Sequence, residues 1–490
     1  MNRRTFLKLA GITPFLYSCI EDKLVDIPVS VHSNANIGHL IRNKDFTQVK
    51  HIRLDDGLSA VIGAGVAGLS AAKVLNAKVF ELGDVVGGTA ASVEFAGLKH
   101  HFGAHYELGY PAGYDEEALS FLEDQKLISW QEDLGLYNFI DSAYLIDKRN
   151  SGRAMVNGVW KETPFIEDEW YHKFEKLMDS HYGLFDLPLS DEVIERYSMS
   201  MEHYLRDTIG LPDHHKIVVD YHMKDDYGAG SEIVSAAAGI AYYACRPYYR
   251  QDIPLFSPPE GNAFLCDRLS RGLDIALKRI VFNISSVDNR YLVSAYNIRE
   301  DRVEEQMFDK VIWAGKMHVL PFVMPEMKLN FERVRHAPWL SVLMELEEFH
   351  EDPHWQIEMP GIDSEFMGFV DSGAQYQTEG KRVITAYYCL EENAREDLLQ
   401  DRVEDFFKRT VEYFDKAFGS DNKQKIKSAM IVPIGHGMAI PDVKFLGIDF
   451  NNEISQKNFA VAGTDNGRLP LFFEAVSSGI KAAKIVTDEN

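Results

Sequence analysis

Residues 59–90 read SAVIGAGVAGLSAAKVLNAKVFELGDVVGGTA, and this stretch decides the fold class. Residues 59–62 are apolar like the end of a buried strand, residues 69–75 continue at helical spacing, and residues 77–81 predict a second strand. The turn between the first strand and the helix has the pattern G-x-G-x-x-G, whose glycines are Gly63, Gly65 and Gly68. Strand, glycine-rich turn, helix and strand in this order indicate an α/β unit.

Each glycine of the turn has its own physical role. Gly63 permits a tight turn, Gly65 lets the backbone approach a pyrophosphate, and Gly68 lets the helix pack closely on the strand. Ala64 lies in the same loop, and the free N–H groups at the start of the helix attract phosphate. Glu81 follows where an acid binds the adenosine ribose hydroxyls in such units. The sequence therefore predicts a bound dinucleotide.

The loop after Glu81 ends in a second glycine pair, Gly87-Gly88, followed by Thr89. An acid, a short loop and Gly-Gly in this order resemble the flavin amine oxidase and phytoene desaturase superfamily, which also includes protoporphyrinogen oxidases. The resemblance implies that the three residues Gly87, Gly88 and Thr89 approach the pyrophosphate of FAD. It therefore favours FAD over NAD as the cofactor.

The C-terminal end of the chain is similar to the same superfamily. Residues 459–463 read as a strand ending in Gly463, and a small-residue helix follows in EAVSSGIKAAKIV. The resemblance implies that Asp465 holds the ribityl or phosphate region and that this helix directs its positive end at the flavin. The usual Glu-Gly before the helix is replaced by Phe473-Glu474, so we expect only a backbone contact to the flavin near Glu474.

The resemblance implies an α/β fold with a discontinuous, FAD-binding, Rossmann-like three-layer domain and an inserted α+β substrate domain. The expected FAD-binding segments are 56–110, 255–335 and 440–490, and the expected substrate segments are 111–254 and 336–439. Helical periodicity in 170–177 and 190–197 and strand-like runs in 340–346 and 383–390 fit the inserted domain. In the FAD-binding domain a strand passes the adenine, and Ile284 is the expected contact.

Three residues are candidates for the reaction site. His105 and Tyr106 follow the second glycine pair in a segment that runs along the flavin in related proteins, and His436 stands between two glycines. The histidines around His105 could instead hydrogen-bond the backbone at the end of a strand, and His436 could be a loop histidine without a role. Both alternatives stay open. No cysteine or helical i, i+4 partner accompanies the histidines around His105, so no metal site is expected.

The N-terminus reads MNRRTFLKLAGITPFLYSC. Arg3-Arg4 and the following Phe-Leu-Lys resemble a twin-arginine signal, and the sequence up to Cys19 resembles a lipoprotein cleavage box. The apolar part is shorter than the about 20 residues that a spanning helix needs. We expect residues 1–19 to be the signal peptide, Cys19 to be lipidated, and residues 20–55 to be a polar tether. The twin-arginine export machinery would then deliver a folded protein to the periplasm or extracytoplasmic membrane face.

The chain of 490 residues carries a formal net charge of −24. Such a surface repels nucleic acid and anionic lipid headgroups, so nucleic acid is excluded as a partner and contact with the membrane is expected through the lipid only. A small cationic substrate would be attracted, although a high charge also serves solubility. Only four cysteines are present, which is not a disulfide framework.

The resemblance implies an FAD-dependent oxidoreductase that removes a hydride from an amine or a C–C bond to flavin N5. The lysine that amine oxidases hold near this atom has no match in a recognisable motif. One alternative is a redox-neutral isomerase similar to UDP-galactopyranose mutase, which needs an arginine-lined diphosphate site. The local arginines are Arg246, Arg250, Arg268 and Arg271. The other alternative is a flavin-binding partner protein without catalysis.

Overall fold

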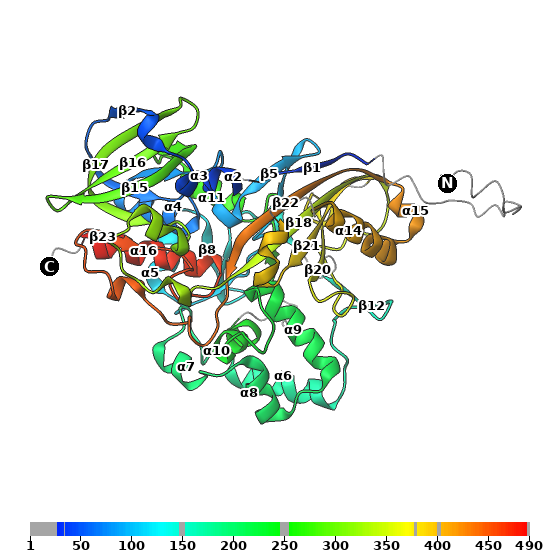
Figure 1. Cartoon of the computed structure of the whole chain (residues 1–490). Helices are drawn as coiled ribbons and strands as arrows, with labels where there is room; N and C mark the ends of the chain where they lie inside the picture. The colour runs from blue at the N-terminus through cyan, green and yellow to red at the C-terminus, as the bar shows by residue number, and fades with distance from the viewer. Residues whose placement is uncertain are drawn as a thin grey trace, which may run out of the picture.

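The computed structural model describes residues 27–33, 35–146, 152–245, 254–376, 380–398 and 403–487. Two eight-stranded sheets stand beside each other, and a lobe of helices lies below them (Figure 1). The expected mixed α/β class is confirmed. Cys19 and the twin-arginine motif lie outside the described residues. Within the described ranges, no helix is both long enough and apolar enough to cross a membrane.

The first sheet carries the glycine motif. Its strands are β2 (Lys50–Arg53), β3 (Gly57–Ile62), β4 (Lys78–Glu81), β14 (Ile275–Leu277), β15 (Arg279–Val287), β16 (Arg290–Asn297), β17 (Arg302–Trp313) and β23 (Phe459–Val461). The order is β14-β4-β3-β17-β16-β15, and β2 and β23 also pair with β17. The second half of β17 lies parallel to β3 and β23, whereas its first half is antiparallel to β16. This long strand therefore joins the parallel and antiparallel parts.

Two helices that are far apart in the chain pack together on this sheet. They are α4 (Val66–Leu75) and α16 (Phe472–Thr487). A Cβ on Gly479 of α16 would lie 2.3 Å from the backbone oxygen of Ala67 in α4, so only glycine allows this approach. Helix α4 ends at Asn76, whose left-handed conformation (φ 49°) lets its N–H bond the carbonyl of Ala72. The N-terminal and C-terminal segments of the chain thus form one layer.

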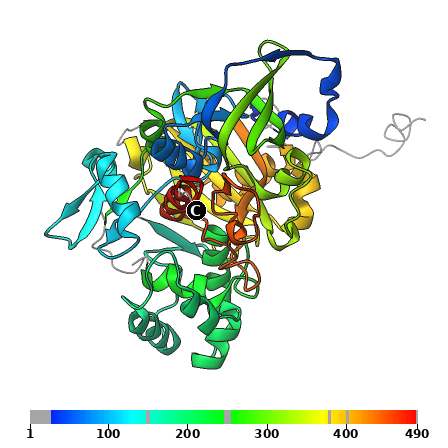
Figure 2. The same ribbon diagram turned by 90° about the vertical axis from the view of Figure 1, so that its left-hand side faces the viewer.

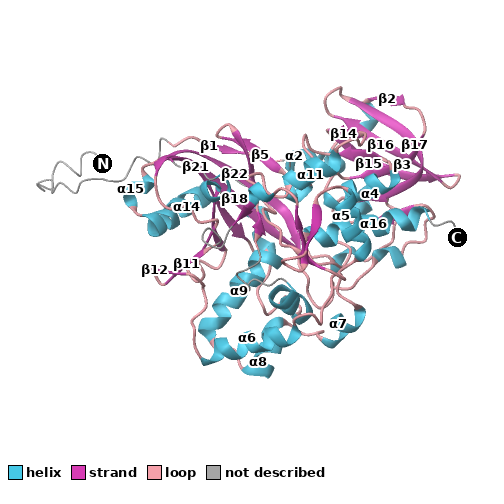
Figure 3. Ribbon diagram, turned by 180° about the vertical axis from the view of Figure 1, so that it is seen from behind, coloured by secondary structure: helices cyan, strands magenta, loops and turns pink. Residues whose placement is uncertain are grey.

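The second sheet belongs to the inserted domain and lies beside the first when seen from behind (Figure 3). Its strands, in spatial order, are β1 (Val29–Val31), β22 (Ile426–Ala439), β18 (His336–Phe349), β21 (Gly380–Cys389), β20 (Phe366–Asp371), β19 (Gln356–Glu358), β11 (Arg153–Val156) and β12 (Val159–Lys161). Helix α14 (Val403–Phe418) covers one face, where buried Phe414 packs against Phe349 and Phe369 of the sheet.

The helical lobe is the green part at the bottom of Figure 2. Its helices are α6 (Glu169–His181), α7 (Asp191–Arg196), α8 (Met201–Ile209), α9 (Asp213–Tyr227) and α10 (Ala236–Ile240). Three of them begin at a side chain that accepts a bond from a backbone N–H of the first turn: Asp168, Ser190 and Ser200. Asp168 and Ser190 stand directly before α6 and α7, which overlap the two segments where helical periodicity was predicted.

Smaller elements complete the chain. They are α2 (Ala35–Gly38), α3 (Leu40–Asn43), β5 (Ser92–Phe95), β6 (Leu98–His101), β7 (Tyr110–Pro111), α5 (Glu116–Asp124), β8 (Ile128–Gln131), β9 (Leu136–Phe139), β10 (Leu145–Ile146), β13 (Leu255–Phe256), α11 (Ala263–Ser270), α12 (Leu320–Val323), α13 (Ser372–Tyr376) and α15 (Ser420–Lys423). The β5–β6 hairpin leads into the segment that contains His105 and Tyr106.

The segment expected to be a polar tether is part of the fold from residue 27 onward. Val29 pairs with Ala429 as β1 joins the edge of the second sheet, and β2 pairs in parallel with β17. Between these strands, Phe46 is buried and stacks on Phe282, with ring centroids 4.0 Å apart. Backbone hydrogen bonds to open strand edges hold this segment, and its polar composition gave no sign of them.

Candidate functional site

A cavity of about 670 Å³ lies between the two sheets and the helical lobe. Its volume is within the range of small-molecule sites. Eleven of the residues predicted for binding or reaction line it, namely Gly63, Gly65, Glu81, Gly87, Gly88, Thr89, His105, Tyr106, His436, Gly463 and Asp465. Four others do not, and these are Ala64, Gly68, Ile284 and Glu474. The motifs from both ends of the chain therefore meet at one cavity.

Backbone contacts fix the glycine loop at the cavity wall. The N–H of Gly63 donates to the carbonyl of Phe80 at 2.8 Å, and that of Gly87 donates to the carbonyl of Ala64 at the same distance. A Cβ on Gly68 would lie 2.0 Å from the carbonyl oxygen of Gly63, so glycine is required here. Gly68 has the predicted packing role, and the backbone of Ala64 ties the two glycine loops together.

Gly65 is a glycine for a different reason. Its φ of −73° and ψ of 176° suit any residue, and it stands immediately before α4. A Cβ here would meet nothing nearer than the carbonyl oxygen of Gly87, 4.0 Å away. Because Gly65 lines the cavity, its missing side chain leaves room beside the N-terminus of α4. Backbone N–H groups at such a helix end bind anions.

The Glu81 carboxylate closes the same loop. It accepts hydrogen bonds from the backbone N–H of Ala64 and of Gly83, each at 2.7 Å. Burial raises the pKa of Glu81, whereas these backbone donors act in the opposite direction. The side chain also lines the cavity, so it can both hold the loop and face a ligand.

Ile284 and the side chain of Glu474 lie away from the cavity, and the backbone contact expected near Glu474 stays a prediction. Ile284 is fully buried in the core beside Val293, and Val281 of the same strand lines the cavity instead. A β-bulge follows Val281 and interrupts the alternation of side chains between the two faces of the strand. A contact predicted from that alternation is therefore shifted. The side chain of Glu474 is buried and pairs with Arg468 at 3.1 Å, away from the cavity. Burial raises the pKa of Glu474 to about 7 although Arg468 lowers it.

The start of α16 also lines the cavity, through Leu471, Phe472 and Ala475. This helix has 16 residues, so its first turn offers unpaired backbone N–H groups and a positive dipole end at the cavity. Gly463 lies at the turn after β23, with a φ of 123° that only glycine adopts without strain. A Cβ on Gly463 would meet no atom within 4 Å.

His105 and Tyr106 lie in an aromatic wall of the cavity. The His105 ring stacks on Tyr387 with centroids 5.2 Å apart, and its Nδ1 donates to the carbonyl of Gly103 at 3.1 Å. The ring of Tyr106 meets Trp355 edge-on at 5.0 Å. Burial lowers the pKa of His105 to about 4, so the ring is neutral at pH 7. His105 therefore bonds backbone and also faces the cavity.

Asp465 is the most strongly held acid of the cavity. Its carboxylate accepts from Nε2 of His336 at 2.9 Å and from the backbone N–H of Met317 at 3.1 Å, and Nζ of Lys316 lies 3.4 Å away. Burial alone would raise its pKa, but Lys316 and His336 together hold the pKa far below its usual range. Asp465 is therefore ionised.

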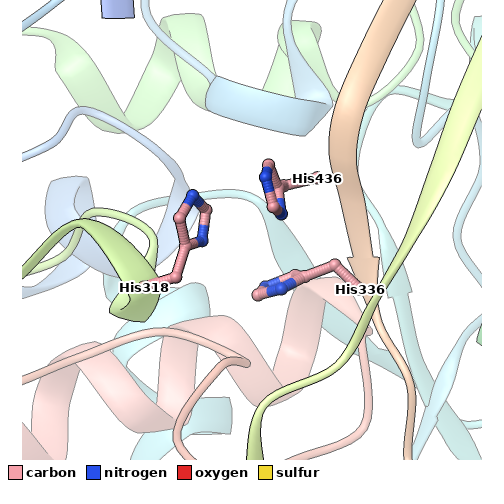
Figure 4. Close-up of side chains that lie close together, drawn as sticks. All are labelled: His318, His336 and His436. Carbon is pink, nitrogen blue, oxygen red and sulfur yellow. The ribbon is translucent and has the colours of Figure 1, made fainter. Parts of the chain in front are cut away.

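A bulge directs His436 toward other histidines. Strand β18 pairs with β22 at Ala337–Met438 and again at Trp339–Ile434, so the three residues 435–437 of β22 lie opposite the single residue 338 of β18. A Cβ on Gly437 would lie 2.8 Å from the Trp339 ring, which explains the glycine. The His436 ring stacks on His318 at a centroid distance of 3.8 Å (Figure 4).

Several cavity residues were missed by the sequence analysis. They include Lys316, His318, Trp339 and Tyr387, together with the acids Asp225 and Asp226 of α9 and Glu107. None stands in a local motif, because each reaches the cavity through long-range strand pairing or domain packing. Glu107 is fixed by Nδ2 of Asn262 at 2.8 Å, and Asp225 by Nε2 of Gln356 at 3.3 Å.

The arginine cluster required by the isomerase alternative does not reach the cavity where it is described. Arg268 pairs with Asp141 at 2.7 Å and covers the Phe264 ring. Neither Arg268 nor Arg271 lines the cavity. Arg246 and Arg250 lie outside the described residues.

Comparison with known families identifies the unit around the glycine motif. A family model described as an NAD(P)-binding Rossmann-like domain matches residues 61–124. This part of the chain is similar to that family and has its Rossmann-like fold. The match covers both glycine loops, α4 and β4, so the Rossmann-like fold predicted from the motif is confirmed. A comparison with curated proteins found no match.

Several solved structures are similar to most of this chain, including the part outside the Rossmann-like domain. A variant of putrescine oxidase is 13% identical, with a TM-score of 0.63, covering 89% of this chain and 99% of its own. A candidate protoporphyrinogen oxidase from Exiguobacterium sp. 255-15 is 14% identical (TM-score 0.59; 89% and 98% covered). A conjugated-linoleic-acid-producing fatty acid isomerase from P. acnes is 14% identical (TM-score 0.60; 88% and 98% covered). These likenesses establish the fold.

The buried histidine His100 predicts a pH dependence of stability. The side chain is only 2% exposed, and burial lowers its pKa to about 4. Between pH 6.5 and 4 the unfolded chain therefore binds a proton that the folded chain excludes, and stability falls as the pH falls. Replacing His100 by phenylalanine should reduce this slope by at most about 1.4 kcal/mol per pH unit. Urea unfolding across this range measures it, with exposed His172→Phe as the control. An unchanged slope in His100→Phe would contradict the prediction.

Proposed function

We propose that the protein is an FAD-dependent oxidoreductase that takes a hydride from a small cationic substrate, most simply an amine. The observation that carries the proposal is a single cavity with two kinds of wall. One wall is the glycine loop of the Rossmann-like domain with the start of α16, and the other holds acids and aromatic rings. A dinucleotide on the first wall would present its reactive ring to a substrate on the second.

The chain fits FAD on several grounds. Gly65 and Gly88 leave the backbone of both glycine loops bare beside the N-terminus of α4, which suits a pyrophosphate. Glu81 would bind the adenosine ribose, and the N-terminus of α16 would lie beside the flavin. When bound, FAD supplies a hydride acceptor at its N5 atom.

The chain's own residues bind the substrate, orient it and keep water away from it. Tyr106, Trp339 and Tyr387 give the second wall large apolar faces, on which a cation is also stabilised. His105 is neutral at pH 7, so it adds no positive charge that would repel an ammonium group. Asp225 and Asp226 of α9 also line the cavity, with Asp225 bonded to Nε2 of Gln356, and carboxylates beside a substrate favour a cation.

The first experiment is spectroscopic. The purified protein should show flavin absorption, and the flavin should bleach anaerobically with a compound from a panel of polyamines, monoamines, amino acids and an isoprenoid. Bleaching by an amine supports the proposal and names the substrate class. A flavin that no compound bleaches would favour a redox-neutral isomerase, which the fatty acid isomerase among the similar structures makes worth testing with an unsaturated fatty acid. Absence of flavin, even after FAD is added, would overturn the proposal.

The acids of α9 give a prediction about specificity. Asp225→Asn removes one negative charge from the cavity, and KM for a cationic substrate should rise about tenfold, which corresponds to about 1.4 kcal/mol. The value of kcat should change less, because the interaction attracts substrate before the reaction. Asp213→Asn at the exposed start of the same helix is the matched control. Equal KM values in the two variants would refute a role in substrate attraction.

We further propose that the twin-arginine route exports the folded protein and that Cys19 carries a lipid. The support is the arginine pair and the lipoprotein-like box in the sequence. Replacing both Arg3 and Arg4 by lysine should leave the protein with its flavin in the cytoplasm, because this route recognises the pair. Cell fractionation and flavin fluorescence measure the outcome. Unchanged export of the double variant would exclude the route.

A further inference from the structure

Three histidines from separate parts of the chain converge beside the cavity (Figure 4). His318 lies in the short turn after β17, His336 begins β18, and His436 stands in the bulge of β22. Each ring offers one nitrogen, and these three nitrogens lie within 4.8 Å of one another. Such a group is a donor set for a transition metal, because imidazole suits Zn, Cu, Fe and Ni.

Two of these rings carry buried nitrogens without a hydrogen-bond partner. Nδ1 of His318 and Nδ1 of His436 are both buried and unpaired. A buried polar atom without a partner costs about 1–3 kcal/mol, so such atoms call for a ligand. Both rings are on the cavity wall, and their stacking leaves their edges side by side. One ligand bound between these two nitrogens would give both of them a partner.

The third ring is held in the manner of a metal ligand. Nε2 of His336 donates to the buried carboxylate of Asp465 at 2.9 Å. A carboxylate behind a histidine fixes the tautomer and orientation of the ring and makes it a better ligand. Arg395 secures the backbone on both sides of the cluster, since its Nη2 donates to the carbonyl of His336 at 2.9 Å and its Nε to that of Gly435 at 2.7 Å.

We propose that His318, His336 and His436 bind one divalent transition metal ion, of the class of Zn²⁺, with a coordination position open to the cavity. Imidazole nitrogens bind zinc at about 2.0–2.1 Å, so the stacked rings of His318 and His436 have to turn, and the three nitrogens have to approach one another, to share one ion. Lys316 and Arg395 are the nearby cations, and Asp465 offsets them with one negative charge. The inference stands on the histidines alone and does not depend on the proposed function.

A second group, Asp168 with His214 and His215, provides a built-in comparison. Its three ligand atoms also lie within 4.8 Å of one another. However, Asp168 already accepts from the N–H of Tyr171 at the start of α6, and the His214 side chain is half exposed. Because this group lies outside the cavity, a variant at His214 tests whether binding belongs to the three-histidine cluster.

The experiment uses the full, flavin-loaded protein, stripped of metal with a chelator and titrated with Zn²⁺ or with Co²⁺ as a coloured probe. We expect one ion per chain and the visible absorption of cobalt bound to nitrogen. His436→Ala and His318→Ala should each weaken binding more than about 100-fold, and Asp465→Asn about 10–100-fold. His214→Ala should bind as the parent does.

Three controls make the result decisive. Flavin content and thermal midpoint are measured on every variant, and His436→Gln replaces the alanine variant if that one does not fold. Binding that persists in all histidine variants of the cluster, or that is lost only in His214→Ala, would overturn the proposal. So would the absence of stoichiometric binding in the folded parent. Because flavin is measured separately, loss of metal with flavin retained leaves the proposed function untouched.

Discussion

Replacing Gly65 by valine is expected to give a folded protein that has lost its flavin. The backbone at Gly65 is extended, with φ of −73°, and the new Cβ would meet no atom closer than 4.0 Å. Valine is therefore accommodated by the protein itself. Its methyl groups would fill the space beside the N-terminus of α4, where we place the pyrophosphate. We expect flavin content to fall at least about tenfold, or by about 1.4 kcal/mol of binding free energy.

Flavin absorption per mole of protein, compared with the thermal midpoint of the apoprotein, measures this effect. Gly152→Val is the matched control, because Gly152 is exposed and a Cβ there meets nothing nearer than 3.9 Å. A Gly65 variant that keeps its flavin would show that the dinucleotide lies elsewhere. A variant that fails to fold would show that the loop itself cannot accept the side chain.

Arg382→Met is expected to cause the largest loss of stability. Arg382 and Asp371 are each 1% exposed, and Nη1 of the arginine lies 3.1 Å from the carboxylate. Nη2 of Arg382 also donates to the carbonyl of Glu351 at 2.7 Å. Removing one partner of a buried ion pair leaves the other charge without compensation, which costs about 3–5 kcal/mol. Urea unfolding followed by tryptophan fluorescence measures the loss.

The loss should also depend on pH. Burial raises the pKa of Asp371 to about 6 even with Arg382 present, and methionine removes the group that lowers it. The folded parent already keeps this proton up to about pH 6, and the folded variant keeps it to still higher pH, so the loss relative to the parent grows as the pH rises above about 6. Arg196→Met, whose partner Glu192 is exposed on α7, should change stability by less than about 0.5 kcal/mol. Equal losses of stability in the two variants would mean that burial does not determine how much an ion pair contributes to stability.

The sequence could predict those parts of the site whose residues lie close together in one short segment of the chain. Gly63, Gly65 and Glu81 lie in one strand–turn–helix–strand unit, so their spacing alone brings them together. Two helices of the lobe were likewise predicted from the periodicity of 170–177 and 190–197, and the structure shows that Ser190 caps the second. Their side chains act on neighbours a few residues away, and such local contacts are encoded locally.

The remaining parts depend on pairings that no local pattern contains. His318, His336 and His436 meet only because the end of β17, the start of β18 and the end of β22 lie together and because one bulge turns His436 toward the others. A bulge also moved the strand contact away from Ile284. Strand β1 shows the same limit, since its residues look like a polar linker until the open edge of β22 is present.

The contact between α4 and α16 determines when the site can be completed during synthesis. Helix α4 ends at Leu75, whereas α16 begins at Phe472, and Gly479 brings their backbones together. A ribosome therefore makes about 400 further residues after α4 before the second helix exists to close the cavity. A cofactor that needs both helices would therefore bind only after α16 has been made. A chain that ends before α16 lacks part of the cavity wall. A cavity with both helices in its wall thus shows that synthesis has passed α16.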